Sequence, residues 1–358
     1  MAHFPFNEDH DMIRDVVKGW LKDWDDYGQK QHVIAKSGQA YDPDGWKTFA
    51  QEQGMAGISI AEEYGGAGLG HLGRAVVMEE TGYVLFPSPF FSTCVICADI
   101  IETFGTEDVK SDWLGRIAAG EAILSFVDAR SLPTDNGEVK LVLDAQFADM
   151  LLIALPSDTG TSKIVMASPD ADGITVTPSE TVDPMRALAS VTLNGFAPKT
   201  NDVLGAVDNA DLDKVLTIAY GALAAECVGG SQRCLDMTLD YAEQRIQFDR
   251  PIASFQAVKH RCADMFINLE AARSAAYYAA DSDNTDERLE AYLIAKPYAS
   301  EAYFSIAADA IQMHGGIGFT WEYPLHYFFK RARANKSLFN SVEDSYDRLA
   351  TLIRQGAA

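Results

Sequence analysis

The sequence predicts an α+β protein in which a small antiparallel β domain lies between two helical domains. Residues 8 to about 120 show helical periodicity, residues 121–207 hold short β-type runs, and residues 208–358 return to long helical segments. Strands and helices are segregated along the chain rather than alternating, which favours α+β over a parallel α/β sheet. We therefore expect an N-terminal helical domain (1–120), a middle β domain (121–207) and a C-terminal four-helix-type bundle (208–358).

The first domain is predicted to be mainly helical. Residues 9–17 place Ile13, Val16 and Val17 on one helical face. Asp44 is a candidate N-cap for a helix through Trp46 and Phe49, because its side chain can accept from free backbone N–H groups. Further helices are expected at 71–84, 92–104 and 106–118.

The middle domain is predicted from five short runs with β-type composition, at 122–127, 139–143, 150–154, 163–166 and 173–176. Asp135-Asn136-Gly137 is typical of a hairpin turn between the first two runs. In the last domain, long helices are expected at 209–244, 255–280, 286–313, 324–338 and 342–354. Pro297 lies within one of them and should kink it or mark its first turn.

The charge of the chain restricts its partners. Its 358 residues include 52 acidic and 29 basic side chains, which give a formal net charge of −23. That balance opposes sequence-independent binding to nucleic acid or to an anionic membrane. Residues 1–10 lack the features of a signal peptide, and no apolar stretch is long enough to span a bilayer, so we expect a cytoplasmic protein.

Five cysteines do not suggest a disulfide framework. Cys94 and Cys97 match C-x-x-C, but their neighbours are apolar and no second pair stands at zinc spacing. We expect buried thiols and no metal site. Gly68-Leu69-Gly70-His71-Leu72-Gly73 matches G-x-G-x-x-G, yet no strand precedes it and no βαβ unit surrounds it. We interpret it as a turn between helices rather than a dinucleotide-binding loop.

Two further segments carry residues suited to a cofactor. Arg245, Phe248 and Gln256 surround the end of one helix and the start of the next, where they could bind a pyrophosphate and stack on a ring. Gln312 to Phe319 ends a long helix with consecutive glycines, which allow backbone to approach a ligand closely. Each pattern alone is equally typical of an ordinary helix end.

Together these segments resemble the acyl-CoA dehydrogenase family across nearly the whole chain. Residues 61–69 (AEEYGGAGL) resemble its "PEEYGG-x-G" loop, with Ala61 in place of Pro. Arg245-x-x-Phe248 with Gln256 resembles "R-x-x-F-G…Q", with Asp249 in place of Gly. Residues 312–324 resemble "Q-x-x-G-G-x-G-F…E-Y-P". The resemblance implies FAD, an acyl-CoA substrate and an electron-transfer flavoprotein as partner. The implied residues for the adenine and pyrophosphate end of a neighbouring subunit's FAD are Arg245, Phe248, Gln256, Gln312, Gly315 and Gly316.

The sequence departs from the family at the catalytic base. The family reaction removes a proton from Cα of the thioester, usually with a Glu in a "Y-E-G-T" segment and in a minority of members with a Glu on the first long C-terminal helix. The first position is Phe339 here, and the second falls at Ala219 and Tyr220. Glu343 and Glu226 are the candidates for a displaced base. For Glu343, capping of the final helix is the simpler interpretation.

The middle domain departs as well, because residues 126–133 lack the family's "T-E-x-x-x-G-S-D" segment that reaches the flavin ring. Residues 338–341 and 224–230 resemble the base-lacking chain of α2β2 acyl-CoA dehydrogenases that act on steroid side chains in bacteria. We therefore expect a subunit that completes a partner's FAD site. The alternatives are a self-sufficient homo-oligomer that uses Glu343 or Glu226, and a CoA-binding or structural homologue without flavin chemistry.

Overall fold

The computed structural model describes residues 6–25, 28–132, 136–198, 203–282 and 284–356. They form two compact units. One unit comprises Met1–Ser37, His71–Phe86 and Tyr220–Ala358, and the other comprises Gly38–Gly70 and Pro87–Ala219. The predicted α+β class is confirmed, with helices at both ends of the chain and two β-sheets in its middle. No described helix is both long and apolar enough to cross a bilayer.

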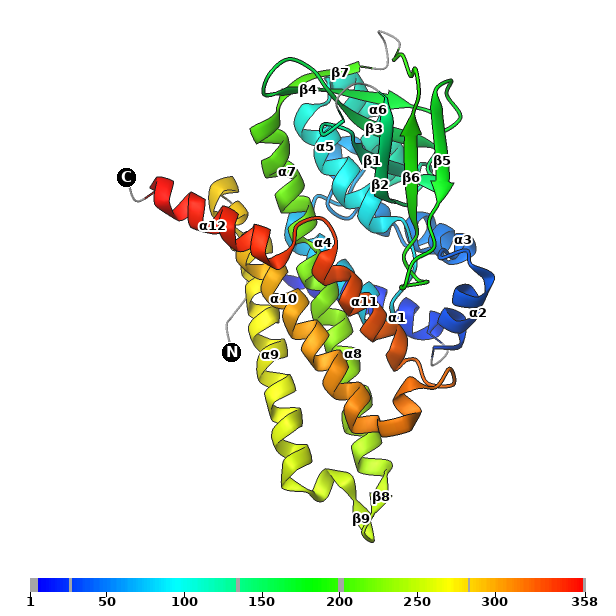
Figure 1. Ribbon diagram of the computed structural model, residues 1–358, viewed down its shortest axis with the longest axis vertical. Coiled ribbons are helices and arrows are strands. Elements are labelled where there is room, and N and C mark those ends of the chain that lie inside the picture. The colour runs from blue at the N-terminus through cyan, green and yellow to red at the C-terminus, as the bar shows by residue number, and fades with distance from the viewer. Residues whose placement is uncertain (1–5, 26–27, 133–135, 199–202, 283, 357–358) are drawn as a thin grey trace. The chain divides into compact units, whose positions relative to one another are not determined.

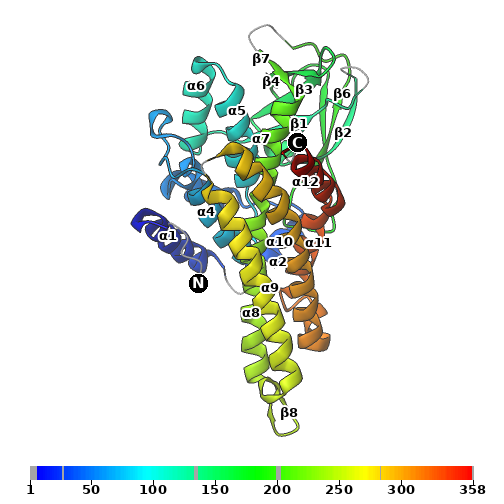
Figure 2. The ribbon, with the colours of Figure 1, turned by 90° about the vertical axis from the view of Figure 1, so that its left-hand side faces the viewer.

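The first unit is built on three long antiparallel helices that lie side by side, α8 (Leu223–Gln244), α9 (Gln256–Asp281) and α10 (Thr285–His314) (Figures 1 and 2). The shorter helices α11 (Leu325–Ser337) and α12 (Val342–Gly356) also contact α10. Asn284 caps α10, since its side chain accepts from the backbone N–H groups of Asp286 and Glu287. Pro297 is buried inside α10, which continues on both sides of it.

The predicted helix 209–244 is two helices, because the chain breaks at Ala222 between α7 (Asn209–Gly221) and α8. The first unit also contains α1 (Glu8–Trp24), α2 (Gln29–Ser37) and most of α4 (Gly70–Val84). Glycines allow α4 and α8 to approach closely. A Cβ on Gly82 would lie 2.4 Å from the carbonyl oxygen of Glu226, and a Cβ on Gly229 would lie 1.8 Å from that of Glu79.

The second unit contains the β domain as two sheets, with strand orders β1-β3-β4-β7 and β2-β6-β5. The strands are β1 (Leu124–Asp128), β2 (Gly137–Leu143), β3 (Met150–Pro156), β4 (Thr161–Ala167), β5 (Ile174–Pro178), β6 (Leu188–Leu193) and β7 (Val203–Asp208). Their inward side chains, among them Val127, Ile153 and Val191, form one apolar core. Among these strands, β1 and β3 run parallel, and the other paired strands run antiparallel.

The predicted hairpin between the first two runs is wrong. β1 and β2 belong to different sheets, with β2 pairing with β6 and β1 with β3. Asp135 itself lies outside the described residues. Two further strands were not predicted, because Ala and Ser dilute the β-type composition of β6, and Gly and Ala dilute that of β7.

The α-helices of the second unit are α3 (Pro43–Lys47), α5 (Ala98–Phe104), α6 (Glu107–Ala118) and most of α7. Thr48–Glu52 and Phe90–Cys97 form π-helices, and Met55–Gly57, Glu62–Tyr64 and Ala145–Phe147 form short 3₁₀ helices. The predicted cap Asp44 is wrong by two residues. Asp42 accepts from the N–H of Gly45, because Pro43 takes the first helical position and leaves Asp44 within the first turn.

The predicted burial of Cys94 and Cys97 and the loop interpretation of the G-x-G-x-x-G match are confirmed. Cys94 and Cys97 are 1% and 0% exposed, and burial raises the pKa of both thiols. Among the described residues before Gly68, the chain forms helices and short helical turns but no strand. The G-x-G-x-x-G match therefore sits at a loop that opens α4, outside any βαβ unit.

Candidate cofactor and active site

A two-residue turn between α8 and α9 presents part of the predicted FAD site. β8 (Ile246–Gln247) pairs with β9 (Arg250–Pro251), and between them Phe248 and Asp249 have φ values of +54° and +61°. Two successive left-handed residues match the twist of a hairpin, and glycine is the usual choice there. Asp tolerates this conformation better than most residues, which explains how Asp249 replaces the expected Gly. The turn leaves the side chain of Phe248 84% exposed.

The polar partners predicted beside Phe248 are also exposed. Arg245 terminates α8, and Gln256 is the first residue of α9. The rings of Phe248 and Phe255 lie edge to face, with 6.0 Å between their centroids, and the guanidinium of Arg250 lies 4.2 Å from the Phe255 ring centroid. The hairpin therefore offers a guanidinium, an amide and an uncovered aromatic ring.

The end of α10 supplies the remaining predicted residues. Gln312, Gly315 and Gly316 are exposed, and Gly315 has φ +63° and ψ −141°, a conformation largely restricted to glycine. A Cβ on Gly315 or Gly316 would meet no atom within 4 Å. These glycines therefore leave the backbone open to an outside group. Behind them, the ring of His314 stacks on Tyr241 with 4.4 Å between centroids.

These two segments lie at the same end of the bundle, because α8 and α10 end there and α9 begins there (Figures 1 and 2). The chemistry of the donor set fits the dinucleotide end of FAD. A guanidinium suits pyrophosphate, an aromatic ring packs against a planar group, and glycine N–H groups can bind phosphate oxygens.

The two positions at which the resemblance places a base form an aromatic pair. The rings of Tyr220 and Phe339 are parallel to within 3°, and their centroids are 3.8 Å apart. Phe339 has φ +65°, which is uncommon for an aromatic residue. Ala219 beside Tyr220 is fully buried. The structure therefore brings the two predicted positions together, and places aromatic side chains where a glutamate is usual.

The candidate base Glu226 is held by an arginine. Its Oε1 lies 2.6 Å from Nη1 of Arg331, and both side chains are buried. The candidate Glu343 is exposed in the first turn of α12. The capping of that helix falls to its neighbours, since Ser341 Oγ accepts from the N–H of Asp344, whose Oδ2 accepts from the N–H of Ser341. Glu343 therefore carries a carboxylate that capping does not use.

In the second unit, the stretch that lacks the family's flavin segment forms an ion-pair cluster. Arg130 donates to both carboxylate oxygens of Asp128, at 2.8 and 2.7 Å, and to Asp213 of α7 at 2.8 Å. These carboxylates raise the pKa of Arg130. The guanidinium thus has internal partners, and the end of β1 is fixed to α7.

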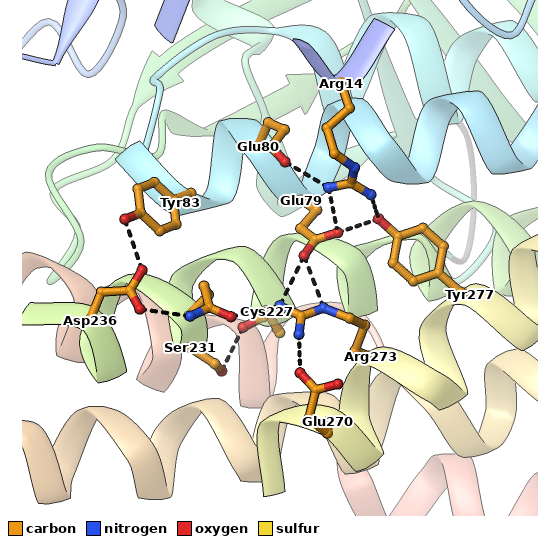
Figure 3. Close-up of polar contacts among 11 residues, drawn as sticks. Arg14, Glu79, Glu80, Tyr83, Cys227, Ser231, Asp236, Glu270, Arg273 and Tyr277 are labelled. Atoms are coloured by element: carbon orange, nitrogen blue, oxygen red, sulfur yellow. Dashed lines mark hydrogen bonds and ion pairs between the residues drawn. The ribbon is translucent and has the colours of Figure 1, made fainter. Parts of the chain in front are cut away.

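A further polar cluster, built around the buried Glu79, was not predicted from the sequence. Glu79 of α4 accepts from Arg14 of α1, and from Arg273 and Tyr277 of α9 (Figure 3). Arg14 also bonds Glu80 at 2.6 Å. These residues line a half-open pocket of about 460 Å³. Their polar atoms are directed at one another, so the cluster fixes α1 and α9 to α4. The only sequence signal was a Glu-Glu pair on the apolar face of a predicted helix.

Comparisons with known proteins assign the family. The family described as "Acyl-CoA dehydrogenase, N-terminal domain" matches residues 7–121, and "Acyl-CoA dehydrogenase, C-terminal domain" matches residues 213–338. "Acyl-CoA dehydrogenase IpdE2" of Mycolicibacterium smegmatis is 32% identical over 345 residues, which cover 96% of this chain and 98% of that protein. The chain belongs to the acyl-CoA dehydrogenase family.

Two solved structures extend this result. The steroid ACAD variant Tcur3481-Tcur3483 is 27% identical, with a TM-score of 0.84 over 98% of this chain and 99% of that chain. The ChsE4-ChsE5 complex from Mycobacterium tuberculosis has a TM-score of 0.88 over 99% of both chains. At 24% identity, the second similarity shows the acyl-CoA dehydrogenase fold alone. Acyl-CoA dehydrogenases are FAD-dependent flavoproteins of β-oxidation.

Proposed function

We propose that this chain is a subunit of an FAD-dependent acyl-CoA dehydrogenase, lacks the usual glutamate base, and completes the FAD site of a partner chain. The assembly, a heterotetramer with a related chain, carries out α,β-dehydrogenation of an acyl-CoA thioester in the cytoplasm. It passes the electrons to an electron-transfer flavoprotein. The acyl group is bulky or cyclic, such as a steroid-derived one.

The aromatic pair Tyr220–Phe339 is the observation that carries this proposal. Removal of a proton from Cα needs a basic group within hydrogen-bond reach of it. Neither ring of the pair can act as that base near neutral pH, because a phenol has a pKa near 10 and a phenyl ring does not titrate. Because both usual positions are aromatic, we infer that the base comes from another chain.

The exposed residues at the end of the bundle support the second half of the proposal. FAD, when bound, accepts a hydride from Cβ of the substrate. Arg245 would hold its pyrophosphate, Phe248 would pack against it, and Gln256 would hydrogen-bond it. Gln312 and the open backbone at Gly315 and Gly316 would complete the contact.

The Asp128–Arg130–Asp213 cluster supports the proposal that this chain contributes to a partner's FAD site rather than to a complete site of its own. In this cluster the guanidinium bonds the chain's own carboxylates, where the family would offer hydroxyl and backbone groups to a flavin ring. This chain would therefore grip a partner's FAD better than its own. Two of the similar solved structures, a steroid ACAD and the ChsE4-ChsE5 complex, bear the names of two proteins each, which favours a heteromer.

A self-sufficient homo-oligomer is the second candidate function. The exposed Glu343 favours it, because its carboxylate is not used in capping α12. Glu226 is less suited to be the base, since its carboxylate already accepts a bond from Arg331. A CoA-binding or structural homologue without flavin chemistry is the third.

Purification of the chain alone and together with a related acyl-CoA dehydrogenase chain tests these functions. We expect little flavin in the lone chain, and flavin absorbance with acyl-CoA-dependent dye reduction in the pair. Full flavin loading and turnover by the lone chain would refute the heteromer. In that case, loss of activity in Glu343→Gln but not in Glu226→Gln would assign the base. Absence of flavin from both preparations would favour the third function.

A further inference from the structure

A lysine is buried in the bundle directly behind the aromatic pair. Lys296 of α10 is 3% exposed, and burial lowers the pKa of its amino group. Two titratable groups on neighbouring elements face it, namely Cys227 of α8 and Asp344 of α12, and both favour its charged form. Burying an ammonium group is costly unless hydrogen bonds compensate for lost water. The partners of Lys296 therefore indicate what it does.

Those partners are backbone carbonyls on both sides of Phe339. Nζ of Lys296 donates to the carbonyl oxygen of Leu338 at 3.1 Å and to that of Asn340 at 2.5 Å. Between these carbonyls, Phe339 holds its left-handed conformation at φ +65°. For a residue with a side chain, this conformation is unfavourable. Two charge-assisted hydrogen bonds from one ammonium group, which are stronger than neutral ones, act against that strain.

We propose that Lys296 is a positioning residue that fixes the turn 338–340, so that Phe339 lies flat on Tyr220. Without the two hydrogen bonds, Phe339 would leave the left-handed region and its ring would leave the stack. The hydrogen bonds and the ring stack are contacts within this chain alone. The functional significance of the aromatic pair, which stands where a family member would hold its base, rests on the proposed function.

Fluorine NMR on the full-length chain tests the role of Lys296. With 3-fluorotyrosine incorporated at position 220 only, the signal is displaced by the ring current of Phe339 as long as the rings stack. Phe339→Leu defines the position of the signal without that ring. We expect Lys296→Met to move the signal to the Phe339→Leu position, and Lys296→Arg, which keeps a cationic donor, to return it towards the native one.

Lys330→Met is the matched control, because Lys330 of α11 contacts the rings of Trp321 and Tyr327 and not the turn. A signal of Lys296→Met at the native position would overturn the proposal. Should Lys296→Met fail to fold, Lys296→Gln replaces it, since one amide group on a shorter side chain cannot reach both carbonyls. The readout needs neither flavin nor a partner, so its result is independent of the flavin-loading test above.

Discussion

Glu226 of α8 and Arg331 of α11 form an ion pair with 2.6 Å between Oε1 and Nη1, and their side chains are 7% and 5% exposed. A carboxylate in this setting stabilises the arginine beside it. Its removal takes a buried counter-charge away from Arg331, which is more costly than loss of an exposed pair.

Replacement of Glu226 should therefore destabilise the fold rather than remove a base. We expect Glu226→Gln to lower the free energy of unfolding by about 3 kcal/mol, measured by denaturant titration. Glu243→Gln, on an exposed position of the same helix, is the control and should change little. Native stability in Glu226→Gln together with loss of turnover would instead identify Glu226 as the base.

The neighbouring carboxylates Glu79 and Glu80 predict a dependence of stability on pH. Burial, and then repulsion by Glu79, raise the pKa of Glu80 above its usual 4.5. The folded state therefore binds this proton more tightly than the unfolded state does. The stability that Glu80 contributes is fully present below pH 4.5 and is lost as the pH rises through the folded-state pKa.

This dependence can be isolated by comparison with Glu80→Gln. The difference in unfolding free energy between the native chain and the variant should be largest below pH 4.5 and should shrink as the pH rises. Urea titrations between pH 4 and 7 measure it, with Glu243→Gln as the control. A difference that grows with pH would show that the ion pair with Arg14 outweighs burial.

Loss of Arg245 should weaken FAD binding without affecting the fold. A charge-assisted hydrogen bond to pyrophosphate contributes about 2 kcal/mol, so Arg245→Ala should lower the affinity for FAD roughly 30-fold. Flavin fluorescence of the complex with its partner chain measures this change. Lys259→Ala is the control, because Lys259 is exposed and lies in the first turn of α9; it should retain FAD. Equal losses in both variants would indicate only a general effect of positive charge.

Two glycine substitutions should separate packing from binding. A Cβ on Gly229 would lie 1.8 Å from the carbonyl oxygen of Glu79, so Gly229→Ala should cost 3 kcal/mol or more, on the order of severe overpacking. A Cβ on Gly316 would meet no atom within 4 Å, so Gly316→Ala should have the same melting temperature as the unsubstituted chain. Its backbone would be less open to phosphate, and the complex should lose FAD. Calorimetry and flavin content measure the two effects.

The sequence predicted helices well where periodicity was strong and ends were marked. The expected helix 286–313 is Thr285–His314, because Asn284 caps it and glycines end it. Strand pairing was harder to predict. Which strands pair depends on contacts far apart in sequence, and so the turn near Gly137 was mistaken for a hairpin although β2 pairs with β6.

At the site, exposed residues in short motifs could be found from the sequence, whereas buried networks could not. Arg245 and Gly315 stand out through their neighbours. Lys296 and Glu79 look like ordinary helical residues, because their partners are 42 or more positions away in the chain. The sequence identified Tyr220 and Phe339 as the two usual base positions, but it could not show that their rings stack on each other.

The exposure of Phe248 has a consequence for the amount of this chain that a cell makes relative to its proposed partner. With Phe319 and Trp321 also 70% and 61% exposed, this unit displays large apolar side chains that a free chain would keep in water. On the proposed function, the partner covers those near the FAD site. If so, we expect the cell to make the two chains in matched amounts, because surplus copies of this chain would keep these apolar side chains in water.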